Sequence, residues 1–372
     1  MAGTASGGPS GVAPCSAGGC HLPPGAENGP ATGPRLLAAP DKFRGTATAP
    51  RAAAAIAAGA RAGLGARSPC RELPLADGGE GTLDVFGGPN QLTTVTGPLG
   101  APVQAGWRLD GRRAVIEMAT TSGLLLAGGA AGNDPMAATT RGTGELIAAA
   151  IRAGATDILV GVGGSATTDG GAGALEVLAP NGGPGIQPPG VRLRVCADVR
   201  TRFLDAARVF GPQKGATPDQ VAALTAQLDG LRADYLRRFG IDVQALDRSG
   251  AAGGLAGGLA AIGAELVEGF DTLADAAGLD KALEDADLVV TGEGRFDAQS
   301  LDGKVVGGVI ARARARNLPV LVVCGAADAT VTVPPGVSVT ALVEMFGTEA
   351  ALTDTATCIA RAVAAHLGAS RD

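Results

Sequence analysis

The sequence predicts an α/β fold with largely parallel sheets, divided into two domains. The chain has 372 residues, and a single domain usually holds about 100–200, so two domains are expected. From residue 35 on, short apolar runs alternate with Ala-rich helical runs, which is the pattern of strand–helix–strand crossovers. Most of the apolar runs lead into a short loop rich in Gly and Asp.

The apolar runs are the expected strands. The first, Leu36–Ala39, precedes a helix expected at Pro50–Leu64 with proline in its first turn. The later apolar runs are Leu73–Leu75, Val115–Met118, Ile158–Val160, Leu193–Cys196, Leu288–Thr291 and Val320–Cys324. The helices expected between them include Gly144–Arg152, Asp219–Phe239, Leu273–Asp285 and Ala350–Leu367. Ligands of parallel α/β folds bind outside the carboxyl ends of the strands, so the loops there are expected to form one cleft.

Two segments are expected to lie outside this pattern. Residues 1–34 are dominated by Gly, Ala, Pro and Ser and lack the basic and apolar parts of a signal peptide, so we expect a disordered leader. The uncharged stretch 251–264 is too short and too rich in Gly to span a bilayer. The six cysteines include no CxxC pair, and a reducing, cytoplasmic location is therefore expected.

The composition limits which ligands and which catalytic groups this protein can use. Hydrophobic residues make up 46% of the chain but aromatic residues only 3%, so the core is expected to consist of Ala, Val, Leu and Ile. A net charge of −6 without any run of Lys or Arg argues against nucleic acid and for small-molecule ligands. With only two histidines, His21 and His366, catalytic triads and His-rich zinc sites are nearly excluded. Proton transfer is then left to carboxylates, lysine or water.

A glycine-rich loop follows one expected strand. Gly161–Ala166 matches G-x-G-x-x-[GA], but the next residues are too rich in Gly to begin a firm helix, and no acidic residue follows about 20 positions on. A nest of backbone N–H groups at Gly163, Gly164 and Ser165 that contacts phosphate or sugar is therefore favoured over NAD binding. A plain flexible turn is the alternative.

Phosphoryl transfer remains compatible with the sequence although no Walker A motif occurs. That reaction needs positioning and charge neutralisation rather than one particular loop. The candidate Mg²⁺ ligands or bases are Asp77, Glu80, Asp198, Glu293 and Asp297. The candidate cations are Lys42, Arg44, Lys214, Arg295 and Lys304. Only four of the 30 basic residues are lysines, which draws attention to them, although each of these charges could equally be a solvated surface group.

Taken in order, the motifs resemble those of class I glycerate kinases. The matching segments, which run in the same order from residue 35 to the end, are Ala39–Gly45, Ala76–Thr82, Val95–Gly100, Ala114–Ala119 with Ser122–Leu124, Gly142–Leu146, Gly161–Gly173, Val209–Ala216, Gly250–Leu255, and Thr291–Asp297 with Gly303-Lys304. The resemblance implies ATP, Mg²⁺ and conversion of D-glycerate to 2-phosphoglycerate. It also implies one flavodoxin-like (Rossmann-like) domain, residues 35–88 plus 286–372, one inserted α/β domain, residues 89–285, and a cleft between them.

The resemblance also suggests roles for individual residues. The catalytic candidates are Asp41, Lys42, Asp198 and Lys304. The candidates for substrate or phosphate binding are Arg44, Gly78, Gly79, Gly163, Gly164, Ser165, Lys214, Glu293 and Arg295. The candidate metal ligands are Asp77, Glu80 and Asp297.

The sequence departs from the family pattern in three places, one of which is Arg141, where an aromatic residue is common. After Asp198 the chain reads Val199-Arg200-Thr201 instead of the usual Asn-Pro-Leu, and the region Leu178–Val191 is shortened. Altered substrate choice or weakened catalysis is therefore an alternative, in which the protein binds a small hydroxy acid. An NAD(P)-dependent oxidoreductase is a second alternative that rests only on the Gly161 loop. The oligomeric state, a homodimer included, stays open.

Overall fold

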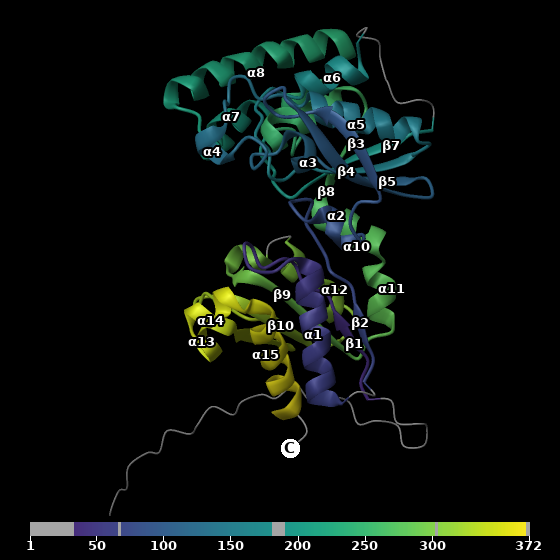
Figure 1. Ribbon diagram of the computed structural model, residues 1–372, viewed down its shortest axis with the longest axis vertical. Coiled ribbons are helices and arrows are strands. Elements are labelled where there is room, and N and C mark those ends of the chain that lie inside the picture. Colours follow the sequence, from purple (N-terminus) through teal and green to yellow (C-terminus); the bar gives the residue numbers. More distant parts are fainter. Residues whose placement is uncertain (1–32, 66–67, 181–189, 302–303, 370–372) are drawn as a thin grey trace, which may run out of the picture.

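The computed structural model describes residues 33–65, 68–180, 190–301 and 304–369, which form two sheets in two lobes along the long axis (Figure 1). The expected leader lies outside the described residues except for 33–34, and so does the centre of the shortened region, 181–189. Within the described ranges, no helix combines the length and the apolar character needed to cross a bilayer.

The first lobe is built on a five-stranded sheet in which all strands are parallel, in the order β11-β10-β9-β1-β2. The strands are β1 (Leu36–Ala38), β2 (Cys70–Glu72), β9 (Leu288–Phe296), β10 (Val320–Ala327) and β11 (Val337–Ala341). Leu36 pairs with both Cys70 and Leu288, so segments from both parts of the chain complete one sheet.

Successive side chains of β1 point to opposite faces of the sheet, so the core of this lobe has two layers, one on each face. Leu36 and Ala38 face helices α1 (Ala49–Leu64) and α15 (Thr355–Ala369), whereas Leu37 faces the opposite layer (Figure 1). The opposite layer is formed by α10 (Gly269–Ala277), α11 (Leu279–Glu284) and α12 (Val305–Arg314). Helices α1 and α15 approach so closely that a Cβ on Gly59 would lie 2.4 Å from the Ala360 carbonyl oxygen. The Ala-rich composition of both helices is what permits this approach.

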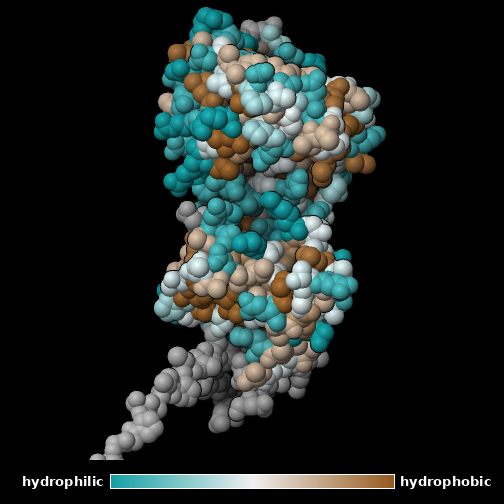
Figure 2. Space-filling model, turned by 90° about the vertical axis from the view of Figure 1, so that its left-hand side faces the viewer, coloured by the Kyte–Doolittle hydropathy of each residue, from teal (hydrophilic) through white to brown (hydrophobic). Residues whose placement is uncertain are grey.

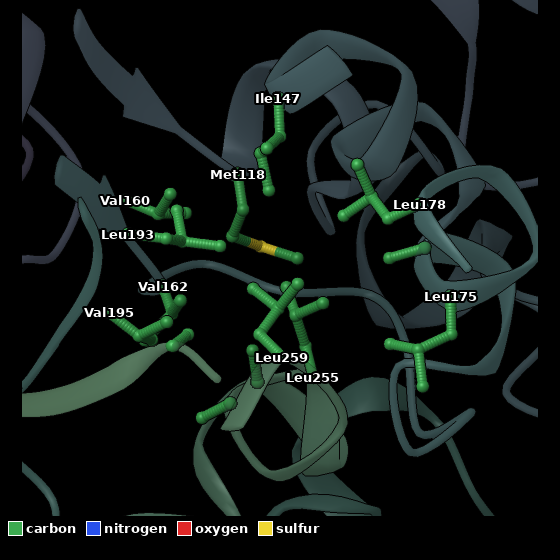
Figure 3. Packing of buried hydrophobic residues seen from close by; sticks show 14 of the residues in the cluster. Met118, Ile147, Val160, Val162, Leu175, Leu178, Leu193, Val195, Leu255 and Leu259 are labelled. Atoms are coloured by element: carbon green, nitrogen blue, oxygen red, sulfur yellow. The ribbon is translucent and has the colours of Figure 1, made fainter. Parts of the chain in front are cut away.

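The second lobe is built on a six-stranded sheet in the order β3-β4-β5-β6-β7-β8. Its strands are β3 (Gln91–Thr96), β4 (Pro102–Asp110), β5 (Arg113–Glu117), β6 (Asp157–Gly161), β7 (Arg192–Ala197) and β8 (Glu265–Glu268). The β3-β4-β5 part is antiparallel and the β5-to-β8 part is parallel. The core packs the sheet against α5 (Arg141–Arg152), α6 (Ala172–Leu178), α8 (Pro218–Phe239) and α9 (Leu255–Ala261). Met118 lies at its centre between Ile147, Leu193 and Leu259 (Figure 3).

The remaining helices are short. They are α2 (Thr82–Val85), α3 (Ala119–Ser122), α4 (Gly129–Gly132), α7 (Ala206–Phe210), α13 (Leu342–Phe346) and α14 (Thr348–Thr353). The 3₁₀ turns are η1 (Phe203–Asp205), η2 (Pro212–Lys214), η3 (Val243–Ala245), η4 (Ala251–Gly254) and η5 (Ala298–Leu301).

Most expected elements are confirmed, but three expectations were wrong. Leu73–Leu75 is not a strand; β2 ends at Glu72, just before Pro74, which has no N–H to donate. The helix expected at Leu273–Asp285 is two helices, because Gly278 adopts a left-handed conformation (φ +80°) between them. The helix expected at Ala350–Leu367 is likewise divided, with Asp354 between α14 and α15. Strands β3, β4, β8 and β11 were not expected.

The expected domain limits at residues 88 and 285 stay a prediction. Phe270 and Leu283 pack in the same core as Val289 of β9 and Val306 of α12. This packing favours a second boundary near residue 268, so that α10 and α11 belong with the first lobe.

Candidate active site

The loop after β1 places a lysine between two carboxylates. The Asp41 backbone N–H donates to the Gly292 carbonyl (2.8 Å), which ties this loop to the end of β9. The Lys42 Nζ lies 3.8 Å from Asp41 Oδ1 and 3.9 Å from Asp77 Oδ1. Burial raises the pKa of Asp41 to about 6, although the Lys42 charge acts in the opposite direction. Arg44, three residues on, is exposed, and no ion pair to it occurs among the described residues.

The loop 76–81 is held by a side chain from the other lobe. Glu117, at the end of β5, is only 7% exposed. Its carboxylate accepts hydrogen bonds from the backbone N–H groups of Gly81 (3.1 Å) and Leu83 (3.2 Å). Burial raises the pKa of Glu117, while these two donors counteract the shift. Glu117 therefore fixes the loop that carries Asp77 and Glu80.

The glycines of two loops make direct contact between the lobes. The Gly163 N–H donates to the Gly78 carbonyl (3.1 Å), and a Cβ on Gly163 would lie 2.4 Å from the Gly79 Cα. Gly78 has a positive φ (+94°), and a Cβ there would meet the Cys196 carbonyl oxygen at 2.5 Å. Close backbone approach thus accounts for these glycines, which the sequence had suggested as phosphate-binding residues. Helix α6 begins only at Ala172, so the Gly161 loop does not open a helix at once, as a dinucleotide site would require.

A cavity of about 530 Å³ lies where the two lobes meet. Figure 2 shows hydrophilic side chains gathered at this narrow waist of the molecule. The lining residues that the sequence had suggested are Lys42, Arg44, Asp77, Gly78, Gly79, Glu80, Gly163, Gly164, Ser165, Asp198 and Lys214. These residues come from five separate loops, which are thus brought to one concavity. A second cavity of about 390 Å³ lies against the start of α1 and shares Lys42, Arg44 and Glu80 with the first.

Asp198 reaches the cavity from the end of β7. Its carboxylate is crowded by protein atoms at the rim, and this desolvation raises its pKa, with the charge of Asp77 acting in the same direction. The positive charges of Lys304 and Lys42 oppose the shift. The same Lys304 charge acts on Glu293, whose pKa burial raises to about 7 and whose Oε1 is buried without a hydrogen-bond partner. Lys304 and Glu293 are therefore electrostatically part of the site, although they do not line the larger cavity.

Arg295 and Asp297 do not line either cavity. Arg295 and Asp297 face each other at 3.8 Å, and Arg295 is 71% exposed in its side chain. Asp297 Oδ1 accepts from the Gln299 N–H (2.9 Å), a local turn contact. A solvated pair at the end of β9 accounts for both residues.

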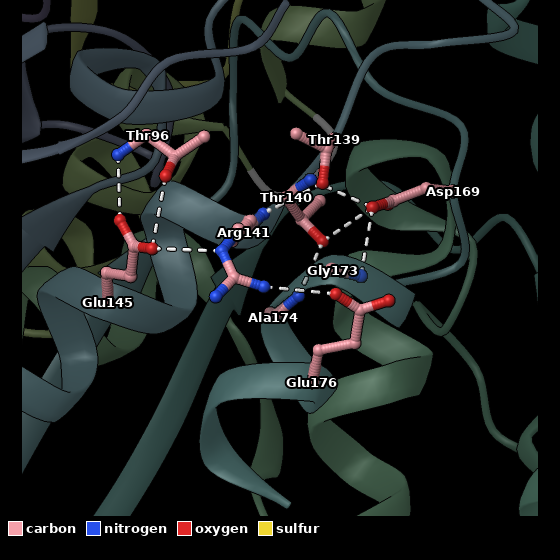
Figure 4. A network of polar contacts seen from close by, with 9 residues as sticks. All are labelled: Thr96, Thr139, Thr140, Arg141, Glu145, Asp169, Gly173, Ala174 and Glu176. Carbon is pink, nitrogen blue, oxygen red and sulfur yellow. Dashed lines mark hydrogen bonds and ion pairs between the residues drawn. The ribbon is translucent and has the colours of Figure 1, made fainter. Parts of the chain in front are cut away.

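On the second lobe, Asp169 lies at the centre of a network of hydrogen bonds (Figure 4). Its Oδ2 accepts from the backbone N–H and the hydroxyl of Thr140, both at 2.8 Å, and from the Gly173 N–H (3.3 Å). The Thr140 hydroxyl in turn accepts from the Ala174 N–H (3.1 Å). One carboxylate therefore joins the starts of α5 and α6, where a negative charge is favourable.

Sequence reasoning missed Glu117 and the apolar part of the wall, which includes Leu124 and Phe210. Glu117 is an acidic residue inside the expected strand Val115–Met118, and this unusual position could have identified it. Leu124 and Phe210 carry no comparable pattern, because apolar residues of loops look like core residues in a sequence.

Mg²⁺ is the metal that the resemblance implies. Across the described ranges, no group of three or more His, Cys, Asp or Glu side chains could hold a metal ion by itself. Mg²⁺ bound to a nucleotide ordinarily uses only one or two carboxylates together with phosphates and water. Asp77 and Glu80 both line the cavity beside Lys42 and Arg44, and the Glu80 carboxylate has no hydrogen bond or ion pair to the rest of the described chain. Their donor chemistry fits such a metal.

Comparison with known proteins shows which protein family this chain resembles. The model of the glycerate kinase family matches residues 36–181 and 185–368. The chain is similar to the glycerate kinase of Bacillus subtilis (strain 168), with 39% identity over 325 residues, covering 78% of this chain and 85% of the relative. It is also similar to the glycerate 2-kinase of Escherichia coli (strain K12), with 37% identity over 325 residues and the same coverage. Among solved structures, a Salmonella typhimurium LT2 protein assigned as glycerate kinase 2 superposes with a TM-score of 0.75 and 35% identity, covering 91% of this chain and 99% of that one.

Proposed function

Since the chain belongs to the glycerate kinase family, we propose that it transfers a phosphoryl group from ATP to the 2-hydroxyl of D-glycerate, with Mg²⁺ as the metal. Phosphorylation of glycerate at the expense of ATP is the family's reaction, and the finer assignment to the 2-hydroxyl is supported by the relative named as a 2-kinase. The observation that carries the proposal is the cavity between the lobes, to which the loops of six family motifs contribute side chains.

Three cations are proposed to bind the phosphates. Lys42 and Arg44 lie in the loop after β1, at the boundary between the two cavities. Lys304 directly precedes α12, and its charge acts on both Asp198 and Glu293. Phosphoryl transfer depends mainly on positioned positive charge, because charge is spread over the oxygens of the transferred group in the transition state. Cations from these two loops meet that requirement.

Carboxylates from both lobes are proposed to complete the site. Asp77 and Glu80 would hold Mg²⁺, which would neutralise part of the triphosphate charge. Asp198 enters from the opposite lobe, and we assign it to orienting the hydroxyl of glycerate and accepting its proton. Asp41 is assigned to holding the Lys42 ammonium in place, since Asp41 is buried and adjacent to it.

A cytoplasmic location is part of the proposal. It is supported by the four described cysteines, Cys70, Cys196, Cys324 and Cys358, which are all free thiols, as expected in a reducing compartment.

The product decides the proposed function. Purified protein would be incubated with ATP, Mg²⁺ and D-glycerate, and the mixture then treated with enolase alone. Enolase converts 2-phosphoglycerate, but not 3-phosphoglycerate, to phosphoenolpyruvate, which is measured by its absorbance. Formation of ADP and phosphoenolpyruvate together is the expected result. Formation of ADP without phosphoenolpyruvate would indicate that the other hydroxyl of glycerate is phosphorylated. The absence of ADP formation would overturn the proposal.

A further inference from the structure

Lys214 is a buried lysine in the wall of the cavity. It ends the 3₁₀ turn η2, between α7 and α8, and only 2% of the residue is exposed. It lines the cavity together with Ser165, Ala251 and Ala252 of the same lobe. Its backbone carbonyl accepts from the Asn133 side-chain amide (2.9 Å), so the turn is held in place from a second loop.

The Lys214 ammonium has fewer partners than it has protons. Its Nζ donates to the Thr167 carbonyl at 2.6 Å, which uses one of three donors. Among the described residues no carboxylate forms an ion pair with it. Asp169 is the acidic residue whose charge acts on Lys214, but the Asp169 oxygens already accept from Thr140, Gly171 and Gly173. Two donors of a buried cation are therefore left for a ligand.

This arrangement is costly unless an anion binds. A buried ammonium without a counter-charge is strongly disfavoured and tends to lose its proton. In agreement, burial lowers the pKa of Lys214 to about 7. A bound carboxylate would supply both the missing counter-charge and the missing hydrogen-bond acceptors. A permanent ion pair with a carboxylate of the protein would leave no place for such a ligand.

The surroundings favour a small anion over a triphosphate. Lys214 is the only cation that the second lobe contributes to the described wall of this cavity, and its neighbours there include the apolar Leu124 and Phe210. A triphosphate carries several negative charges and needs several cations, and these lie across the cavity at Lys42 and Arg44. A short acid with one negative charge matches a wall that offers a single cation.

We infer that Lys214 binds the carboxylate of the acceptor substrate and thereby selects short hydroxy acids over neutral alcohols. The inference rests on the proposed function, and it assigns the second lobe to the acceptor and the first lobe to the phosphates. With the carboxylate held at Lys214, the hydroxyls of the acid are left to face Asp198 and the phosphates. A purely structural role, in which Lys214 only holds the Thr167 carbonyl, is the competing explanation.

A charge-matched pair of substrates separates the two explanations. The wild-type protein and the variants Lys214→Met and Lys214→Gln would be assayed with D-glycerate and with its neutral isostere D-glyceramide. Met keeps the shape without donors, and Gln keeps a donor for the Thr167 carbonyl without a charge. Lys281→Met, at an exposed lysine of α11, is the control. Thermal unfolding of each variant would be measured alongside.

We expect the wild-type protein to prefer D-glycerate over D-glyceramide by at least about 10-fold in kcat/KM, as the loss of one charged hydrogen bond implies. In both Lys214 variants the KM for D-glycerate rises about 10- to 100-fold, the KM for ATP stays within about twofold, and the preference for the acid collapses toward unity. Equal losses for both substrates, with the preference retained, would support the structural role and overturn the inference.

The wild-type protein alone also tests the inference. If it phosphorylates D-glyceramide as well as D-glycerate, no cation recognises the carboxylate, and the inference fails whether or not the variants fold. If it phosphorylates neither compound, the proposed function fails instead, so the two failures can be told apart.

Discussion

The two walls of the cavity hold their charges in different ways. On the first lobe, Lys42 is 20% exposed in its side chain and lies between Asp41 and Asp77, and Arg44 is open to solvent. On the second lobe, Lys214 is 2% exposed and its ammonium donates one hydrogen bond. The acidic residue whose charge acts on Lys214 is Asp169, and its carboxylate already accepts a hydrogen bond from the Thr140 backbone N–H. Partly exposed charges in mutual contact can rearrange around a large polyanion with its metal. A single buried charge in a rigid wall is suited to one small, fixed ligand.

The largest expected effect comes from removing the central cation of the first wall. Lys42→Met is expected to lower kcat/KM for both substrates by about 10²–10³, because a positioned charge near the phosphates is lost and Asp41 and Asp77 are left facing each other. Steady-state kinetics with varied ATP and glycerate would measure this, with Lys281→Met as the matched lysine control. Normal turnover of the Lys42→Met enzyme would show that the first wall does not bind the phosphates.

The next largest effect tests the contact between the walls. Gly163→Ala places a Cβ 2.4 Å from the Gly79 Cα, so the two loops must separate. We expect a loss of about 1–3 kcal/mol in the free energy of unfolding, as in other overpacked sites, and higher KM values for both substrates. Chemical denaturation and kinetics would report these changes. Gly230→Ala in α8, where nothing lies within 4 Å, is the control and is expected to stabilise slightly. Equal behaviour of the two variants would refute the loop contact.

A pH-dependent effect is expected at Glu293, a carboxylate of the first lobe whose Oε1 is buried without a hydrogen-bond partner. The pKa of Glu293 is raised to about 7, so the folded protein binds its proton more tightly than the unfolded chain does. The stability that this proton contributes is complete below about pH 4.5 and is lost as the pH rises through 7. Glu293→Gln should therefore be more stable than the wild type by about 1–3 kcal/mol at pH 8, and the gain should vanish by about pH 4.

Urea denaturation of wild type and Glu293→Gln at pH 8, 6 and 4 would measure that gain. The exposed Glu349→Gln is the matched control, for which no such pH dependence is expected. A Glu293→Gln variant that is less stable at pH 8 would mean that the charged form of Glu293 is stabilised by its surroundings, contrary to its buried and unpartnered Oε1.

The smallest effect is expected at the outer edge of the second wall. Arg141 pairs with Glu145 and Glu176, both at 3.1 Å, and its side chain is 45% exposed (Figure 4). Exposed ion pairs contribute little, so Arg141→Ala should cost less than about 1 kcal/mol of stability and leave both KM values unchanged. Thermal unfolding together with kinetics would check this. A larger loss would show that the rigidity of this wall extends from Asp169 out to Arg141.

Much of the site could be predicted because its polar residues follow apolar runs. Asp41 stands after β1 of the first sheet and Asp198 after β7 of the second, and in each sheet the parallel strands bring their carboxyl ends to one edge. The contacts that the glycines of these loops make could not be predicted in this way. Gly78 and Gly163 stay candidates for phosphate binding, and they also make a backbone contact between segments about 85 positions apart in the chain.

The sequence by itself determined the alternation of strands and helices, the choice of small aliphatic residues for the core and the order of the motifs, because periodicity and composition are local properties. Only the tertiary structure decided that Glu117 crosses to the other lobe, and that Lys214 is buried without an ion pair to any described carboxylate. These features depend on which surfaces meet, and burial and the pKa shifts that it causes arise only when distant segments exclude water together.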